Sequence, residues 1–108
     1  TMTSGNNIIN ALGSNSGSVK GASQFGFNLR ANTNPTAGLD PVGAGASVPM
    51  PGYSNPNSFR FVDGEAITNS TVATDFKIFT ATYIVNVPSN QSPGVYATTM
   101  TFTAVASF

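Results

Sequence analysis

The chain contains no cysteine, no histidine and no tryptophan, and only 7% of its 108 residues are charged. Without cysteine it can form neither a disulfide nor a thiolate metal site. Without histidine it lacks the commonest general base and the commonest metal ligand. No nucleophile motif surrounds any serine, although Lys20 and Lys77 could serve as bases. We therefore predict that the protein is not an enzyme and that it uses no cofactor and no metal.

The balance of charge narrows the choice of partners. Lysine plus arginine equals aspartate plus glutamate, at four each, so the formal net charge is zero. A nucleic-acid partner would require a basic patch, which four cations cannot build. No run of about 18 apolar residues is present, so no membrane-spanning helix is expected. The near-zero charge leaves self-association unopposed, and the uncharged polar composition favours an extracellular or cell-surface location.

Alternation of side chains predicts β-strands. Residues 95–108 alternate as expected for a strand with one face in a core and a threonine-rich opposite face. Shorter segments at 7–12, 23–31, 58–62 and 76–87 also read as strands, with weaker signals at 47–50 and 66–74. Residues 88–94 hold two prolines and a glycine, so they are expected to turn and to pair 76–87 with 95–108 as an antiparallel hairpin.

These strands predict an all-β fold, an antiparallel β-sandwich of jelly-roll, immunoglobulin-like or pilin-like type. Residues 1–19 are predicted to form an N-terminal extension and residues 20–108 the sandwich. Within it, 32–57 carries five prolines and is expected to be a long surface loop. The alternative is that this segment wraps the sandwich and packs its apolar side chains, Leu39, Val42, Val48, Met50 and Tyr53.

Three smaller sites are open to interpretation. Asp63-Gly64-Glu65 could supply half of a calcium site, but it lacks the regular acidic spacing of a calcium loop, so a solvated turn is favoured. Asn69 and Asn90 begin N-glycosylation patterns. A threonine row could bind ice or carbohydrate, although an exposed strand face has the same composition. Its members are Thr99, Thr101 and Thr103.

Lys77 shares a strand face with aromatic and β-branched residues. A buried lysine next to an asparagine and a carboxylate can form an isopeptide crosslink. Asn28 and Asn86 are the candidate amides, with Glu65 or Asp75 as the carboxylate. The alternative is that Lys77 lies at the end of its strand and extends its ammonium group into water.

The end of the sequence carries a resemblance. It reads Tyr-Ile-Val-Asn-Val-Pro from Tyr83, then Gln-Ser-Pro-Gly-Val-Tyr from Gln91, followed by alternating threonine and apolar residues. These residues, about a quarter of the chain, resemble the C-terminal hairpin of secreted bacterial fimbrial and spore-coat-U-like domains. The chain departs from chaperone-assembled pilins in one respect, because those usually carry a disulfide and this chain has no cysteine.

The resemblance implies a structural subunit whose sheet is completed by the N-terminal extension of a neighbouring copy. We accordingly expect a filament, pilus or coat that self-assembles from identical subunits by β-strand addition. The anchors of the donor strand would be Ile8, Ile9 and Leu12. The acceptor core would comprise Phe25, Phe27, Phe59, Phe61, Phe79, Tyr83, Tyr96, Met100, Phe102 and Phe108. The alternative is a monomeric adhesin or carbohydrate-binding module that uses the 32–57 loop, with Tyr53 as an exposed aromatic.

Overall fold

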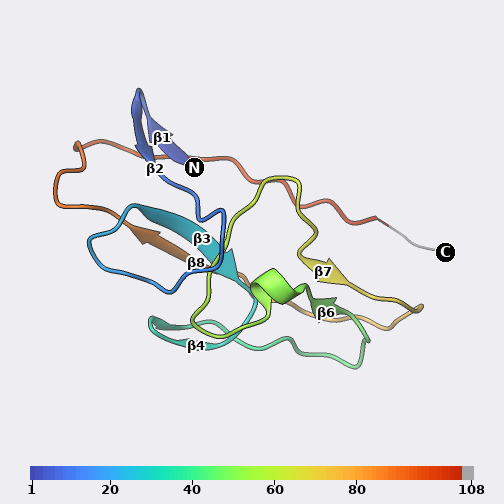
Figure 1. Cartoon of the computed structure of the whole chain (residues 1–108). Helices are drawn as coiled ribbons and strands as arrows, with labels where there is room; N and C mark the ends of the chain where they lie inside the picture. The colour runs from blue at the N-terminus through green and yellow to red at the C-terminus, as the bar shows by residue number, and fades with distance from the viewer. Residues whose placement is uncertain (106–108) are drawn as a thin grey trace.

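The computed structural model describes residues 1–105, in which the chain is all-β, as predicted, with one 3₁₀ turn, η1 (Pro51–Tyr53). Its strands are short and pair antiparallel, two by two, as β1 with β2, β3 with β8, β4 with β5, and β6 with β7 (Figure 1). Their bounds are β1 (Met2–Ser4), β2 (Asn7–Ile9), β3 (Gln24–Asn28), β4 (Asn32–Thr33), β5 (Thr36–Ala37), β6 (Val48–Pro49), β7 (Thr68–Asn69) and β8 (Thr82–Asn86). The sheets are small and separate. The described residues therefore show the all-β class but not the predicted arrangement of two packed sheets.

The β3–β8 pair forms the centre of the molecule. Its register runs from Gln24 opposite Asn86 to Asn28 opposite Thr82, and every residue of β3 is buried. The other edge of β3 is also occupied, because the N–H of Phe27 donates to the carbonyl of Arg60. β3 is therefore an interior strand, whereas β8 has a paired neighbour on one edge only.

The apolar core lies on one face of this pair. Phe27, Leu29 and Tyr53 form its buried centre, and the rings of Phe27 and Tyr53 stack with centroids 4.8 Å apart. Partly buried side chains surround them, namely Met50, Phe61, Ile67, Phe79, Ala81 and Met100. Burying one large apolar side chain contributes about 1.5–3 kcal/mol, so these residues dominate the stability of the fold.

The 32–57 segment folds against this core more closely than a surface loop would. Tyr53 and Met50 pack inward, as expected if the segment wraps the core. The other three apolar side chains expected to pack are exposed instead, namely Leu39, Val42 and Val48.

A buried amide holds the 32–57 segment in place. Asn28 donates to the side-chain oxygen of Asn32 at 2.7 Å and to two backbone carbonyls, so its burial is compensated.

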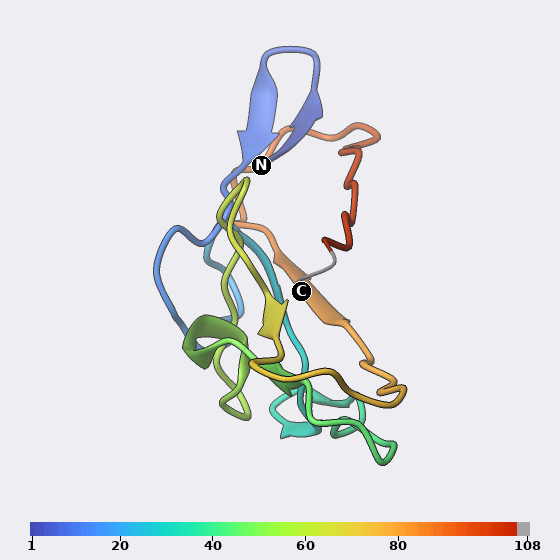
Figure 2. The same ribbon diagram turned by 90° about the vertical axis from the view of Figure 1, so that its right-hand side faces the viewer.

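Residues 1–19 do not form a free extension in the isolated chain. The N–H of Leu12 donates to Phe25, and the carbonyl of Leu12 accepts from Phe61, both at 2.8 Å. Ile9 is only 2% exposed, and Ser16 pairs with Phe59. The segment thus joins its own body, while the β1–β2 hairpin projects from one end (Figure 2).

The predicted strand at 95–108 does not form within the described residues. Only Ala97 pairs, with Thr3, and the expected hairpin with 76–87 is absent: β8 pairs with β3, and the arm does not pair with the other edge of β8. Residues 95–105, which we term the C-terminal arm, extend without regular structure (Figure 1). Side-chain alternation defines two faces, but a strand also requires a hydrogen-bonded neighbour. Phe108 lies outside the described residues.

Candidate functional site

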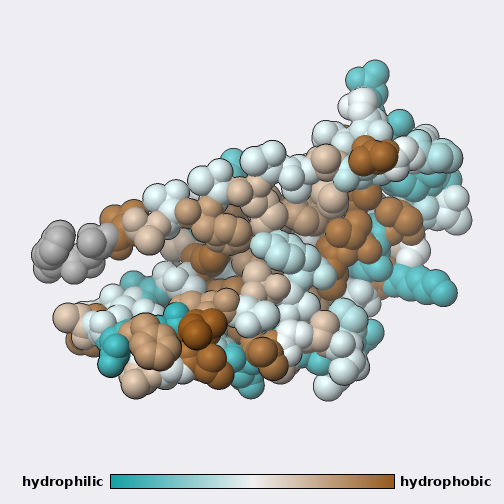
Figure 3. Space-filling model, turned by 180° about the vertical axis from the view of Figure 1, so that it is seen from behind, coloured by the Kyte–Doolittle hydropathy of each residue, from teal (hydrophilic) through white to brown (hydrophobic). Residues whose placement is uncertain are grey.

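A groove of about 1270 Å³, lined by apolar and mostly uncharged polar side chains, runs along one side of the core. Its two walls are residues 61–74, which include β7, and residues 100–105 of the C-terminal arm. Apolar side chains gather in the hollow between the arm and the rest of the molecule (Figure 3). The floor comes from β3, β8 and their flanking residues, and consists of Phe27, Leu29, Phe79, Ala81 and Tyr83.

The apolar face of β8 is only half covered. Tyr83, which lines the groove, and Val85 on the same face are 44% and 48% exposed, whereas Ile84 on the opposite face is 5% exposed. The Tyr83 ring contacts Phe27 with centroids 5.6 Å apart, so this face belongs to the core side of the sheet. A sheet that is apolar on both faces requires a second layer on each. The groove marks the place where one layer is incomplete.

The backbone around the groove is open to hydrogen bonding. Among the described residues, 98–105 form no backbone–backbone hydrogen bond, and neither do residues 70–73. The outer edge of β8, at Tyr83 and Val85, is also without a backbone partner in this part of the chain. Unpaired strand edges of this kind are the features to which an additional strand binds.

The groove brings together six of the ten residues predicted for the acceptor core, namely Phe27, Phe61, Phe79, Tyr83, Met100 and Phe102. Phe25 and Phe59 lie elsewhere, buried where they pair with residues 11 and 16 of the N-terminal segment. Tyr96 instead accepts a hydrogen bond from Gln91 at 2.7 Å.

Sequence reasoning missed Leu29 as part of the site, although it continues the alternation of Phe25 and Phe27. It also missed Ile67 and Tyr53, which line the groove from weakly patterned segments. Leu29 could have been found by extending the alternating face by one step. For Ile67 and Tyr53 no sequence signal pointed toward the groove.

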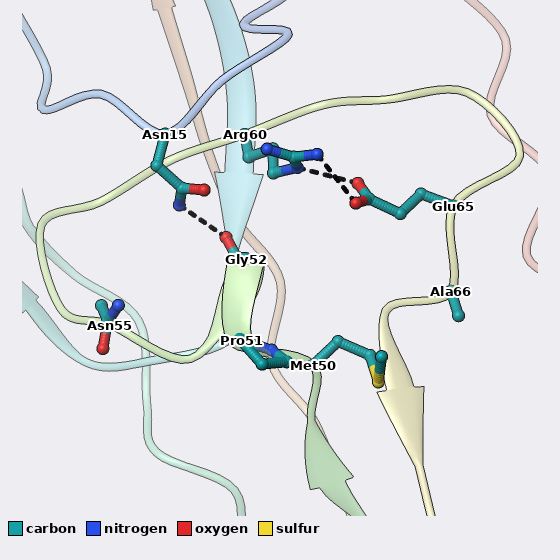
Figure 4. A pocket seen from close by; sticks show the side chains of 8 residues that line it. All are labelled: Asn15, Met50, Pro51, Gly52, Asn55, Arg60, Glu65 and Ala66. Atoms are coloured by element: carbon teal, nitrogen blue, oxygen red, sulfur yellow. Dashed lines mark hydrogen bonds and ion pairs between the residues drawn. The ribbon is translucent and has the colours of Figure 1, made fainter.

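An ion pair occupies a neighbouring pocket of about 550 Å³ (Figure 4). Arg60 donates to both carboxylate oxygens of Glu65 at 2.9 Å, and the Tyr53 hydroxyl donates to Glu65 at 2.7 Å. These hydrogen bonds, that of Arg60 foremost, lower the pKa of Glu65. Burial, together with Glu65, raises the pKa of Tyr53 to about 12. The three side chains thus form one hydrogen-bonded cluster, in which Arg60 and Glu65 remain 25% and 30% exposed.

The structure also places the residues of the predicted calcium, glycosylation and threonine-row sites. Glu65 is paired with Arg60, and the described residues hold no group of three or more histidine, cysteine, aspartate or glutamate side chains that could hold a metal ion. Asn69 and Asn90 are exposed, and glycosylation there stays a prediction. The threonine row of the C-terminal arm is exposed at Thr99, Thr101 and Thr103.

The isopeptide residues are not brought together. The ammonium group of Lys77 donates to the carbonyls of Gly43 and Gly45, both at 3.3 Å. The amide of Asn28 is held by Asn32, and that of Asn86 by Ser18 and Gln24.

The expectation that Tyr53 is an exposed aromatic is wrong, because Tyr53 is only 1% exposed. Its ring stacks on Phe27, and its hydroxyl is bonded to Glu65. It cannot serve as a platform for a sugar ring.

Comparison with known proteins adds no relative: no family model, no curated protein and no solved structure matches the chain. The resemblance to fimbrial and spore-coat-U-like domains therefore stays a prediction. No helix among residues 1–105 has the length and apolar character needed to cross a bilayer.

Proposed function

We propose that the protein is a structural subunit of an extracellular filament, pilus or coat, and that identical copies assemble by β-strand addition. The observation that carries this proposal is the groove whose walls contain two stretches without backbone hydrogen bonds among the described residues, 70–73 on one side and 98–105 on the other. A strand inserted there would cover the exposed face of β8 and hydrogen-bond to the walls. It would complete an antiparallel β-sandwich with β3–β8 in one layer.

The size and chemistry of the groove suit a polypeptide strand. Its volume of about 1270 Å³ exceeds the range of about 300–1,000 Å³ that is usual for small-molecule sites. Its lining contains only two charged residues, Asp63 and Glu65, and Glu65 is neutralised by Arg60. The groove therefore favours an uncharged, extended segment with apolar side chains on one face.

The chain contains a segment of that description. Residues 1–19 carry no charged side chain and include the predicted anchors Ile8, Ile9 and Leu12. Leu12 is paired on both sides within its own body, Asn10 accepts from the N–H of Phe25, and Ile9 is buried, so the portion that can leave at small cost is residues 1–8, which includes Ile8 alone of the three anchors. Fully extended, eight residues span about 26–29 Å. Donation to the next copy would make a head-to-tail contact, which propagates as a filament if it does not close.

The test is a charge placed in the groove wall. Phe102 lines the groove, and because it is 58% exposed in the isolated chain, Phe102→Asp should change the monomer's stability little. In the assembled state the new carboxylate would be buried without a partner. We expect polymerisation, followed by electron microscopy and sedimentation, to slow at least about tenfold, which corresponds to about 1.4 kcal/mol.

Leu39→Asp is the matched control, since Leu39 is 63% exposed, close to the exposure of Phe102, and does not line the groove. It should polymerise at the rate of the unaltered chain. Strand addition in this groove is refuted if the two variants polymerise equally well. An unaltered protein that stays monomeric at every concentration would refute the structural role itself.

A further inference from the structure

The base of the C-terminal arm rests against the N-terminal hairpin at three points. Thr3 and Ala97 exchange two backbone hydrogen bonds, both of 3.0 Å. Gly94 lies so close to Ser4 that a Cβ at residue 94 would fall 2.6 Å from the Ser4 hydroxyl oxygen. These two contacts place the start of the arm alongside β1.

The third contact involves the other strand of the hairpin. The side-chain amide of Gln91 donates to the carbonyl of Ile8 at 3.1 Å. The same amide donates to the Tyr96 hydroxyl at 2.7 Å, which ties the 88–94 connection to the start of the arm. We call the contacts between the hairpin and residues 91–97 the latch.

The latch is the arm's one backbone attachment among the described residues. Beyond Ala97 the arm touches the body through side chains, as where Phe102 meets the edge of the Phe27 ring at 6.4 Å. The latch thus positions one wall of the groove. It also keeps residues 2–9 folded as a hairpin, so the segment proposed as donor cannot extend while the latch is closed.

Opening the latch requires little energy. Its hydrogen bonds are exposed, and each is worth about 0.5–1.5 kcal/mol net. An isolated two-stranded hairpin of this kind is marginally stable in water. The latch can therefore open without unfolding residues 9–16, in which Ile9 is buried and the segment beyond it remains paired with β3 and Phe59.

We propose that the N-terminal hairpin is a self-inhibitory latch that controls donation of the N-terminal segment. While it is closed, it withholds the donor segment and holds the arm as one wall of the groove. When it opens, residues 1–8 are released for a neighbouring copy. This regulation rests on the proposed function, because it concerns the same groove and the same assembly.

A disulfide across the latch provides the experiment. Thr3 and Ala97 form a hydrogen-bonded antiparallel pair, in which Cα atoms lie about 5.5 Å apart, within the range a disulfide spans. The chain has no cysteine of its own, so Thr3→Cys with Ala97→Cys introduces a single possible bridge. We expect the oxidised protein to polymerise at least tenfold more slowly than the unaltered chain and to recover on reduction.

The matched control is Val42→Cys with Ile78→Cys. These residues also exchange two backbone hydrogen bonds, of 3.1 and 2.8 Å, and both are exposed, but they lie outside the latch. Its oxidised form should polymerise normally. Circular dichroism and thermal melting verify that both oxidised proteins are folded before their assembly rates are compared.

Loosening the latch should act in the opposite direction. Gln91→Ala removes the bond to Ile8 and should speed assembly several-fold. Tyr96→Phe removes the Gln91–Tyr96 bond and the bond from the Tyr96 hydroxyl to the Ser92 carbonyl, neither of which involves the hairpin, and it should leave the rate within twofold of the unaltered chain.

The outcomes separate the two proposals. If the oxidised Thr3–Ala97 protein polymerises as fast as the control, or if Gln91→Ala has no effect, the latch is overturned and strand addition stands. If neither the unaltered chain nor the reduced variants polymerise, the proposed function fails and the latch falls with it.

Discussion

Tyr53 connects three parts of the molecule through one residue. Its ring stacks on Phe27 of β3, its hydroxyl reaches Glu65, and its carbonyl accepts from the N–H of Leu29 at 3.0 Å. Its neighbours in sequence are proline, glycine and serine, which typify an exposed loop. Burial of Tyr53 is therefore a consequence of tertiary contacts that composition does not reveal.

Tyr53→Phe keeps the stacked ring and removes the hydrogen bond to the carboxylate. We expect the free energy of unfolding in urea at pH 7 to fall by about 1.5–3 kcal/mol. Tyr83→Phe is the control, because Tyr83 is 44% exposed, and it should change the stability by less than about 0.5 kcal/mol. Equal effects of the two substitutions would show that the Tyr53 hydroxyl contributes nothing.

The same hydroxyl predicts an alkaline response. The pKa of Tyr53 in the folded chain, about 12, lies above its unfolded value of about 10. Its contribution to stability is therefore complete below pH 10 and is lost as the pH rises toward 12. The loss of stability between pH 9 and 11 should be smaller in Tyr53→Phe than in the unaltered protein.

Glu65 predicts an acid response of opposite sign. Its hydrogen bonds to Arg60 and Tyr53 depress its folded pKa below the unfolded value of about 4.3. Its contribution is present above that value and is lost as the pH falls through the folded pKa. Glu65→Gln should flatten the fall in urea stability between pH 5 and pH 2. Asp63→Asn, the control for a neighbouring exposed carboxylate, should not flatten it to the same extent.

At the scale of elements, alternation located the central strands but not their partners. The observed β3 lies within the predicted 23–31 segment, and β8 lies within 76–87. Phe25, Phe27 and Leu29 gave β3 a clear period of two. The expected neighbour of β8 was the last segment of the chain, whereas the observed neighbour is β3. Local pattern records which face is apolar and carries no information on which edge pairs with which.

The contact of the 32–57 segment with β8 is testable at Gly38. Gly38 has φ of +90°, and a Cβ there would clash with the Thr82 hydroxyl and lie 2.7 Å from the carbonyl of Arg30. Gly21 has the same φ but open space around it, so Gly21→Ala carries the backbone penalty alone, about 1–2 kcal/mol. Gly38→Ala should lower the urea midpoint further than Gly21→Ala. Equal midpoints would mean that the segment does not press on β8.

At the scale of the whole molecule, the isolated chain is elongated, with extents of 48 × 28 × 20 Å, and one layer of its core is incomplete. Apolar side chains on β8 stay half exposed because no described strand covers them. A surface of this kind, on a chain of zero net charge, is suited to association. The layer is incomplete because of how β8, the C-terminal arm and residues 61–74 are arranged together, and not because of any one of these segments.

Hydrogen exchange should report the completion of that layer. In the monomer the amides of Thr99, Thr101 and Thr103 have no backbone partner among the described residues, so they should exchange rapidly. On assembly, at least some of these amides should become at least about a hundredfold slower, as expected for hydrogen-bonded strand edges. The amides of Phe25 and Phe27 donate within the monomer and should be slow in both states. Arm amides that remain fast in the assembled protein would contradict strand pairing there.

The sequence by itself determined the all-β class, the absence of thiol and imidazole chemistry, and most of the apolar residues that meet at the groove. These follow from composition and from period-two alternation, which are local properties. The tertiary structure alone decided that Tyr53 is buried, that residues 9–16 join their own body and that the arm stands apart from β8. Those features depend on pairing between residues distant in sequence, whose relative free energies no local pattern encodes.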